Sequence, residues 1–297
     1  MKYENVWSEI GAATGSERAE NFPLSRKCTY GTGGPADCLF FPDCAEKAVS
    51  LVKELKERAI PFVFLGAGSN VLISDEGFRG AVVSTEKLRG ISSSANFVTV
   101  AAGERIEELV KYALYNSLGG IEFLSGIPAT VGGAAAMNAG CFGKNVGDYV
   151  SYVVSTDGVK NRADCGFDYR TSVFKRENVG IISVCFDLEN VEFEQSESKV
   201  EYFRGLRKSK HPKGRSCGSV FKNDGYFAGK VIENCGLKGY RIGGAKISEK
   251  HANFIVAENG AKSADVYGLI RYAKEKAEEV FGIKLSEEVE YLGNFDG

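Results

Sequence analysis

The sequence contains only two histidines, His211 and His251, and none of its eight cysteines belongs to a C-x-x-C pair. Structural zinc sites are usually built from such pairs, so their absence argues against a zinc centre. The shortage of histidine excludes most His-rich metal sites, and we expect no bound metal. Scattered cysteines in a chain of this length indicate buried free thiols rather than a disulfide framework.

Long apolar runs are also lacking, and no stretch approaches the length of a membrane span. The N-terminal residues have early acidic side chains and no apolar core of a secretory signal, so we expect a cytoplasmic protein that binds no membrane. The net charge of −2 argues against nucleic-acid binding. P-loop and G-x-S-x-G motifs are missing, which removes support for P-loop and hydrolase-elbow chemistry.

The 297 residues suffice for one large or two ordinary domains, and 43% hydrophobic with 26% charged residues is typical of a globular protein. Residues 1–25 suggest a polar helical lead-in. Asp43, followed by Glu46, predicts the cap of the next helix. Apolar periodicity and turn residues predict strands at 36–41, 61–66, 81–85, 97–102, 149–156, 159–162, 179–189, 253–257 and 289–293, and helices at 45–59, 104–118, 192–204, 228–237 and 263–281.

The composition changes near residue 190, where a polar, acidic segment begins. We therefore expect an α+β protein with two domains, 1–190 and 191–297. The first is expected to have two lobes, 1–85 and 86–190. Both domains mix helices and strands, which fits the α+β class.

The glycine-rich stretch 119–147 is too small-sided for a core helix and too apolar for a solvated linker. Glycine is retained where the backbone takes unusual angles or approaches something closely. One interpretation is main chain laid against a large flat or anionic ligand, with Ser125, Asn138 and Asn145 as polar contacts. The alternative is tight backbone packing at a domain junction.

A second glycine-rich turn, GAGSN at 66–70, follows a predicted strand and exposes successive N–H groups that suit phosphate. An ordinary loop is an equal alternative. The sequence GTGGPA at 31–36 nearly matches the dinucleotide fingerprint, but no apolar strand precedes it and Pro35 removes a backbone donor. Two glycine-rich stretches in one domain favour a dinucleotide.

Other polar residues have ordinary alternatives on the sequence alone. The basic run 204–215 is usually a solvated face, although it leads into SCGSVFKN. A serine in the position of Ser219 is ordinarily a turn residue. Arg170 is ordinarily a surface residue or an ion-pair partner, although its planar guanidinium also suits binding of a carboxylate. Glu287 and Glu288 precede the last strand and are by default solvated.

Together these stretches resemble the UDP-N-acetylenolpyruvoylglucosamine reductase family from about Cys28 to Gly293. Each motif is modest alone, but seven in the family's order are highly specific. They are TYGTGGPAD, PFVFLGAGSNVLISDEGFRG, GIPATVGGAAAMNAGCFG, YRTSVF, GSVFKN, GLKGYRIGGAKISEKHANFIV and EEVEYLG. The stretch between Ile242 and Phe254 lacks an inserted tyrosine-bearing loop, which resembles the type II subclass.

The resemblance implies an FAD-binding domain of the vanillyl-alcohol-oxidase type, followed by a smaller α+β substrate-binding domain. It implies non-covalent FAD and NADPH as co-substrate, and we expect a monomer. It also implies that two loops contact FAD, through Gly66, Ala67, Gly68, Ser69, Asn70, Gly126, Ile127, Thr130, Gly132, Gly133, Asn138 and Gly140.

Matching motifs residue by residue, the resemblance implies Arg170, Ser219 and Glu288 as catalytic residues. It implies Lys222, Asn223 and Lys238 as substrate contacts, with Lys238 on the diphosphate. The implied substrate is UDP-N-acetylglucosamine-enolpyruvate, and the product, UDP-N-acetylmuramate, is a peptidoglycan precursor.

The implied chemistry has two half-reactions. NADPH delivers a hydride to the flavin, and reduced FAD then passes it to C3 of the enolpyruvyl group. Arg170 and Glu288 stabilise the developing charge, and Ser219 donates a proton to C2 with help from Lys222 or Arg215. Five positions depart from the family pattern: Cys28, Ala129, Asp224, Glu258 and Glu290.

Two other functions stay open on the sequence. One is another FAD oxidoreductase of the same fold, such as a sugar-lactone oxidase. The other is a non-catalytic nucleotide-binding homologue, against which the presence of all three implied catalytic residues argues.

Overall fold

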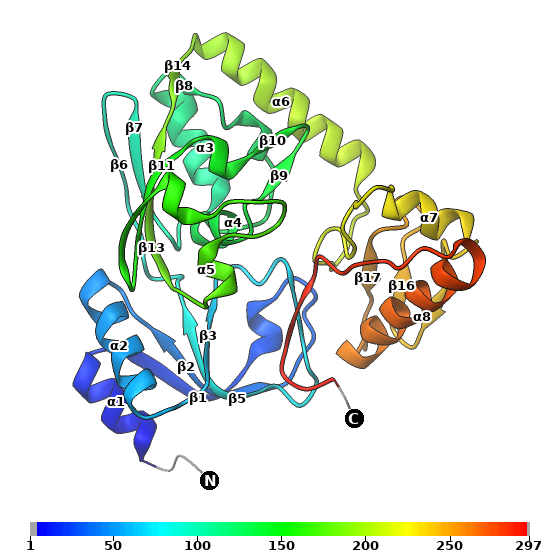
Figure 1. Ribbon diagram of the computed structural model, residues 1–297, viewed down its shortest axis with the longest axis horizontal. Helices are drawn as coiled ribbons and strands as arrows, with labels where there is room; N and C mark the ends of the chain where they lie inside the picture. The colour runs from blue at the N-terminus through cyan, green and yellow to red at the C-terminus, as the bar shows by residue number, and fades with distance from the viewer. Residues whose placement is uncertain (1–4, 296–297) are drawn as a thin grey trace. The chain divides into compact units, whose positions relative to one another are not determined.

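The structure is a computed structural model that describes residues 5–295, and it divides into two compact units. The first unit holds residues up to 20, 38–67 and 80–207, and the second holds 21–37, 68–79 and the residues from 208 onward. Each unit is therefore assembled from three separate chain segments (Figure 1). Segment 68–79 carries strand β4 (Val71–Ile73), which explains its place in the second unit: β4 pairs with the C-terminal strand.

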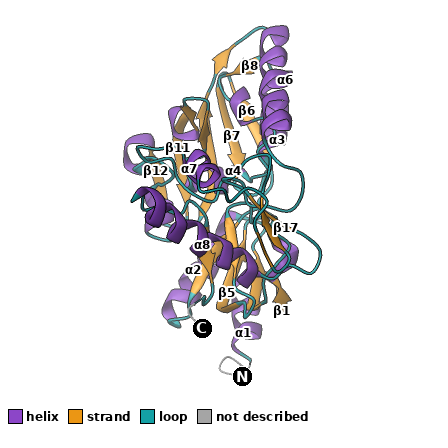
Figure 2. Ribbon diagram, turned by 90° about the vertical axis from the view of Figure 1, so that its right-hand side faces the viewer, coloured by secondary structure: helices purple, strands orange, loops and turns teal. Residues whose placement is uncertain are grey.

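The first unit is built on a five-stranded antiparallel sheet with the strand order β12-β11-β13-β7-β6 (Figure 2). Alternate residues such as Val98, Val100, Val184 and Phe186 are fully buried, as expected for a sheet with one face on the core. Helices α3 (Ile106–Tyr115) and α4 (Val131–Ala136) contribute to the same core. The strands are β6 (Ile91–Ser94), β7 (Phe97–Ala101), β11 (Val150–Ser155), β12 (Gly158–Asn161) and β13 (Ile181–Asp187).

Helix α6 (Phe193–Lys210) packs on the first unit, and for this reason that unit extends to residue 207. Ser196 donates a hydrogen bond to the buried Glu122 carboxylate at 3.1 Å, and Val200 joins the core. The sequence placed a boundary near 190 because the exposed face of this helix is acidic and polar. The compact unit ends later because the inner face of the helix is buried.

A second sheet, with the order β1-β2-β5-β3, packs against helices α1 (Val6–Thr14) and α2 (Ala45–Glu57). The Trp7 and Phe40 rings meet edge to face with centroids 6.1 Å apart. The main chain passes from one compact unit to the other within three of these strands. The strands are β1 (Glu17–Pro23), β2 (Pro35–Phe41), β3 (Phe62–Leu65) and β5 (Phe78–Ser84).

Two local predictions in this region are wrong. The expected helical lead-in over residues 1–25 ends at Thr14, because Gly15 takes a left-handed conformation (φ 62°) and a strand follows; residues 1–4 lie outside the described residues. The expected cap at Asp43 is also absent. The N-cap of α2 is Cys44, without a side-chain cap, and Asp43 instead accepts a hydrogen bond from Lys47 at 2.8 Å.

The second unit combines helices α7 (Ala228–Asn234) and α8 (Ser263–Phe281) with the three-stranded sheet β15-β16-β17 (Figure 1). The predicted inner face of α8 is confirmed from Val266 to Ala277, whereas Val280 is 53% exposed. The final strand β18 (Glu290–Leu292) pairs in parallel with β4. The sheet strands are β15 (Arg241–Ile242), β16 (Ala245–Ile247) and β17 (Ile255–Ala257).

Several short elements complete the described chain. They are α5 (Val173–Arg176), β8 (Leu118–Gly119), β9 (Gly140–Cys141), β10 (Lys144–Asn145), β14 (Glu189–Asn190) and the 3-10 turns η1 (Leu24–Lys27), η2 (Glu122–Leu124), η3 (Val146–Asp148) and η4 (Arg162–Cys165). Over residues 5–295, we find no helix that is both long and apolar enough to cross a membrane. All eight cysteines are free thiols, as the sequence predicted.

Candidate active site

The two predicted cofactor loops meet inside the first unit at Gly66 and Thr130. A Cβ on Gly66 would overlap Thr130 Oγ1, so only glycine permits this close approach. Thr130 is the N-cap of α4, and its hydroxyl oxygen accepts a hydrogen bond from Gly133 N at 3.3 Å. The structure therefore brings the 66–67 turn against the 126–133 loop.

Most main-chain donors of the 126–133 loop already have partners. Val131 N donates to Glu104 O at 2.8 Å, and Gly132 N donates to Ala102 O at 2.9 Å. A Cβ on Gly132 would lie 2.7 Å from the Ala102 Cβ. Packing thus explains Gly132, and these N–H groups are committed to the fold rather than to a ligand.

Asn138 and Gly140 lie beside Arg170 in the same unit. The Asn138 amide donates to Asp168 O at 3.0 Å and accepts from Gly147 N at 2.8 Å. Arg170 Nη2 donates to Gly140 O at 2.8 Å, and its guanidinium lies 5.1 Å from the centroid of the Tyr169 ring. These bonds fix the guanidinium against the glycine-rich stretch.

The backbone of Arg170 is left-handed, with a φ of 57°. Such a conformation costs a non-glycine residue on the order of 1 kcal/mol or more and persists only when the surroundings enforce it. Here the Asn138 bond to Asp168 O and the Arg170 bond to Gly140 O enforce it. Strained residues cluster at functional sites, which agrees with a functional Arg170.

In the second unit, the segments that carry Ser219 and Glu288 run side by side. Glu288 N donates to Val220 O at 2.8 Å, and Lys222 N donates to Ser286 O at 2.9 Å. Asn70, from the GAGSN turn, donates through Nδ2 to Glu288 O at 2.9 Å and accepts from Glu290 N at 2.9 Å. Three segments far apart in the sequence thus converge on Glu288.

A buried thiol lies next to this convergence. Cys217 is 3% exposed and precedes Ser219 by two residues. Burial, with a smaller contribution from the nearby Glu288 carboxylate, raises the pKa of the Cys217 thiol to about 12, although its interaction with the Tyr30 hydroxyl lowers it in part. The thiol therefore stays protonated at neutral pH and does not act as a nucleophile.

The predicted substrate residues Lys222, Asn223 and Lys238 also belong to the second unit. The Asn223 side chain accepts from Ala228 N at 2.9 Å and so anchors the loop before α7. Lys238 pairs with Glu233 at 2.8 Å. Arg215, the other suggested aid to Ser219, donates to Asn259 Oδ1 at 2.8 Å.

Sequence reasoning missed Arg207, which it grouped with a solvated basic run. Arg207 is only 9% exposed, and its Nη2 donates to Phe123 O at 2.9 Å and contacts Cys141 Sγ at 2.8 Å. Its Nη1 has no hydrogen-bond partner within the described part of the chain. The spacing of Ser196, Val200 and Arg207 on one helix face is the signal that could have revealed its burial.

Arg207 also borders the predicted flavin loop. A Cβ on Gly126 would lie 3.4 Å from Arg207 Cδ, and the guanidinium lies 5.2 Å from the Phe142 ring centroid. A buried guanidinium with an unsatisfied nitrogen requires an anion or acceptor nearby. An anionic, aromatic cofactor such as FAD fits this combination of cation, aromatic ring and glycine.

Two departures from the family pattern have structural explanations. Glu258 forms a two-bond ion pair with Arg241, at 2.8 and 3.0 Å, which ties the ends of β15 and β17 together. Ala129 is 9% exposed, and its main chain bonds to Ile127 O and Ile106 N. Its methyl group is accommodated within the packed loop. Nothing in the structure explains Asp224.

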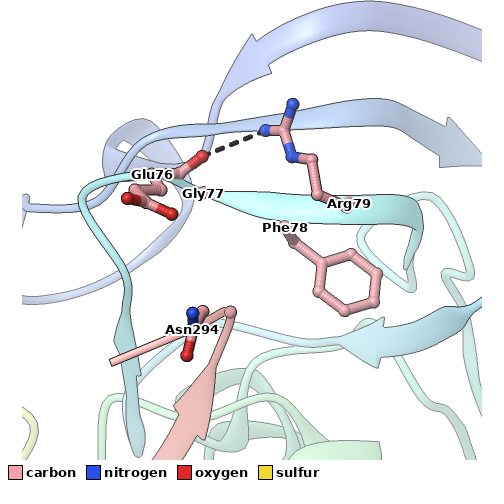
Figure 3. Close-up of a pocket in the computed structure, with 6 residues that line it drawn as sticks. Glu76, Gly77, Phe78, Arg79 and Asn294 are labelled. Atoms are coloured by element: carbon pink, nitrogen blue, oxygen red, sulfur yellow. Dashed lines mark hydrogen bonds between the residues drawn. The ribbon is translucent and has the colours of Figure 1, made fainter. Parts of the chain in front are cut away.

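The cavity drawn in Figure 3 lies elsewhere in the second unit. It has a volume of about 580 Å³ and is lined by Glu76, Gly77, Phe78, Arg79, Gly293 and Asn294. None of the predicted catalytic or substrate residues lines it. Within residues 5–295, no group of three or more His, Cys, Asp or Glu side chains could hold a metal ion.

Comparison with known proteins supports a two-domain assignment. Residues 36–162 match the family model of an FAD binding domain. Residues 209–292 match that of the UDP-N-acetylenolpyruvoylglucosamine reductase C-terminal domain. With the glycine loops and Arg207, these matches define the chain as a two-domain, FAD-dependent oxidoreductase. The expected α+β fold, an FAD-binding domain followed by a smaller domain, is confirmed.

Relatives across nearly the whole chain identify the family. The chain is 38% identical to the UDP-N-acetylenolpyruvoylglucosamine reductase of Caldanaerobacter subterraneus subsp. tengcongensis, covering 92% of this chain and 93% of that protein. Identity to the Geobacillus thermodenitrificans reductase is 37%, covering 98% of each. The solved reductase of Thermus caldophilus matches with a TM-score of 0.80 and 32% identity, over 94% of this chain and 99% of that one.

The chain therefore belongs to the UDP-N-acetylenolpyruvoylglucosamine reductase family. The predicted enzyme class and cofactors, an FAD-dependent oxidoreductase that uses NADPH, are confirmed by this membership. The individual site residues stay predictions.

Proposed function

We propose that this chain reduces the enolpyruvyl ether of UDP-N-acetylglucosamine-enolpyruvate to UDP-N-acetylmuramate through Arg170, Ser219 and Glu288. The observation that carries the proposal is the bond from Glu288 N to Val220 O at 2.8 Å. It holds two of the three proposed catalytic side chains on adjacent segments. Asn70 fixes the Glu288 main chain from a third direction.

FAD would be held in the first unit by the Gly66–Thr130 loop contact and by Arg207. We assign Arg207 Nη1, which is buried and has no partner among the described residues, as a donor to an anionic group of the cofactor. When bound, FAD supplies hydride storage between NADPH and the enolpyruvyl double bond.

Side chains of the protein then supply the proton and stabilise the negative charge that develops on the substrate. Ser219 Oγ donates the proton to C2, as general acid. A serine hydroxyl is a weak acid in water, so the ammonium of Lys222 assists it electrostatically. Arg170 stabilises the negative charge that develops beside the substrate carboxylate, because its planar guanidinium is already fixed by Gly140 O.

In the proposal, Glu288 is the second catalytic residue of the second unit, beside Ser219. Its main chain is held in place by hydrogen bonds to Val220 and Asn70. Lys238 and Asn223 contact the substrate, with Lys238 on its diphosphate. The reaction belongs to peptidoglycan precursor synthesis in the cytoplasm, and so serves cell-wall formation, cell shape and cell division. The enzyme acts as a monomer.

The test is the spectrum and turnover of the purified protein. We expect a yellow protein that releases FAD on denaturation. It should oxidise NADPH rapidly only when the enolpyruvyl nucleotide is present, and slowly with oxygen. A colourless protein that cannot be reconstituted with FAD would contradict the proposal, as would a yellow protein that leaves the enolpyruvyl nucleotide unchanged.

A further inference from the structure

Arg170 lies at the tip of a closed four-residue turn in the first unit. Asp168 N donates to Thr171 O at 3.1 Å, and Thr171 N donates back to Asp168 O at 3.2 Å. Tyr169, also at the tip, is 44% exposed, so the turn lies at the surface. Surface turns are ordinarily mobile, and a left-handed Arg170 persists only where its surroundings enforce it. Contacts outside the turn must therefore hold the guanidinium in place.

Ser172 follows this turn directly and is completely buried. It occupies the N-cap position of α5, where a serine side chain ordinarily accepts a hydrogen bond from the first turn of its own helix. Among the described residues, no such capping bond to Ser172 is present. Its Oγ instead donates to Ala136 O, in the last residue of α4, at 2.7 Å. The hydroxyl thus forgoes the usual cap of α5 and ties the turn to α4.

Three hydrogen bonds join the turn to residues 136–140. The serine bond holds the residue that follows the turn. Asn138 Nδ2 donates to Asp168 O at 3.0 Å and holds the first residue of the turn. The guanidinium at the tip donates to Gly140 O at 2.8 Å. Without the serine bond, one end of the turn is released, and the guanidinium can leave its place beside Gly140.

We propose that Ser172 is a positioning residue for the Arg170 guanidinium in the reduction of the enolpyruvyl ether. Electrostatic stabilisation is strongest when the donor is already fixed where the charge develops, because no reorganisation is then needed during the reaction. Ser172 acts through the main chain of the turn and not on the substrate itself. This inference rests on the proposed function, which assigns Arg170 to the negative charge that develops on the substrate.

The test is a stopped-flow measurement of both flavin half-reactions in Ser172→Ala. Reoxidation of the reduced flavin by the enolpyruvyl nucleotide should slow by about 10- to 100-fold, the effect of a small displacement of a catalytic group. Reduction of the flavin by NADPH should keep its rate, because the proposal gives Arg170 no part in that step. Ser172→Cys fills the space with a weak donor and should slow reoxidation in the same way. It carries the test if the alanine variant does not fold.

A double variant separates positioning from a purely structural role. In the Arg170→Ala background, Ser172→Ala should cause no further loss of the reoxidation rate, since the group that it positions is gone. A serine that only stabilised the fold would instead slow reoxidation in both backgrounds alike.

The matched control is Ser155→Ala. Ser155 is 3% exposed in the same unit, and its hydroxyl donates to Gly158 O at 2.7 Å. The variant therefore loses an equally buried bond to a main-chain oxygen. Ser155 belongs to the hairpin of β11 and β12, which carries none of the proposed site residues. Both half-reactions should keep their rates in this control.

A second readout requires no turnover. Trypsin cleaves the chain after arginine, and it acts on segments that open locally. Cleavage between Arg170 and Thr171 should therefore be severalfold faster in Ser172→Ala than in Ser155→Ala, because only the first variant releases the turn. Mass spectrometry of the fragments identifies the cleaved bond.

Three results would overturn the inference: unchanged reoxidation in both Ser172→Ala and Ser172→Cys, equal slowing of the two half-reactions, or a further loss in the Arg170→Ala background. Failure of the proposed function is seen separately, as an unchanged protein whose reduced flavin is not reoxidised by the enolpyruvyl nucleotide. In that case the comparison of trypsin cleavage decides whether Ser172 holds the turn, and equal cleavage in the two serine variants would show that it does not.

Discussion

Arg207 and Phe123 are joined by a buried hydrogen bond of 2.9 Å from Nη2 to the carbonyl oxygen, while Arg207 Nη1 has no hydrogen-bond partner in the described residues. One side of the guanidinium thus anchors helix α6 to the 3-10 turn η2, and the other side is buried without a hydrogen-bond partner among the described residues. Arg207 lies in a basic run that the sequence predicts to be solvated, but in the structure its side chain is buried in the first unit.

We expect Arg207→Met to weaken FAD binding by about 30-fold or more, because removing one member of a buried charge pair costs roughly 2–5 kcal/mol. Without FAD, the stability of the same variant should change little, since the loss of the buried bond to Phe123 O offsets the removal of a buried charge. Flavin fluorescence titration and thermal unfolding of the apoprotein measure the two effects.

Arg204→Ala is the matched control for this prediction, because Arg204 lies on the same helix, is 47% exposed and pairs with Glu107 at the surface. Exposed pairs contribute little, so FAD affinity should change less than about threefold. Unchanged FAD affinity in Arg207→Met would show that Arg207 has a packing role only.

We expect Ser219→Ala to separate the two half-reactions. Reduction of the bound flavin by NADPH should keep its rate, whereas reoxidation by the enolpyruvyl nucleotide should slow by about 10²- to 10⁴-fold, the usual contribution of a general acid. Stopped-flow absorbance of the flavin measures both steps. The exposed Ser286→Ala in the same unit should affect neither, and equal losses in both steps for Ser219→Ala would assign Ser219 a structural role.

We expect Gly66→Ala to destabilise the protein by about 1–3 kcal/mol, because its methyl group would overlap Thr130 Oγ1 in a packed loop. Thr130→Ala alone should cost about 1 kcal/mol through loss of the α4 cap. The double variant should lose less stability than the sum of the two single variants, because alanine at position 130 has no hydroxyl for the new methyl group at position 66 to overlap. Denaturant unfolding measures all three.

Gly205→Ala is the control for this cycle, because a Cβ at Gly205 would meet nothing within 4 Å and the residue lies inside helix α6. It should stabilise the protein by a few tenths to about 1 kcal/mol, as alanine is the better helix former. Strict additivity of Gly66→Ala and Thr130→Ala would show that the two loops do not touch in solution.

Particular residues show how far sequence patterns reach. The periodic faces of α2, α3 and α8 and the hairpin around Asp157 were predictable, because helix and strand periodicity depend on local spacing. The end of α1 at Thr14 was missed because the left-handed cap of Gly15 outweighed a weak helical pattern. The prediction of an Asp43 cap was wrong because the carboxylate of Asp43 bonds to Lys47 instead.

The boundary between units shows the same limit on a larger scale. Composition changes near 190, but Ser196 and Val200 bury one face of α6 against the first unit. The mean polarity of a helix sequence does not reveal a narrow buried stripe on one of its faces. The segment 68–79 likewise joins the second unit through the parallel pairing of β4 with β18, a non-local contact that composition does not report.

The sequence by itself determined the family, the cofactor and the types of residue available for chemistry, because ordered motifs and glycine positions are properties of the chain. Tertiary structure alone decided that Arg207 is buried, that Asn70 and Val220 hold Glu288, and that Ser172 bonds to Ala136. The physical reason is that burial and hydrogen-bond partnership depend on segments distant along the chain. The local sequence defines the chemical type of each side chain, whereas the packing of distant segments determines its burial and its hydrogen-bond partners.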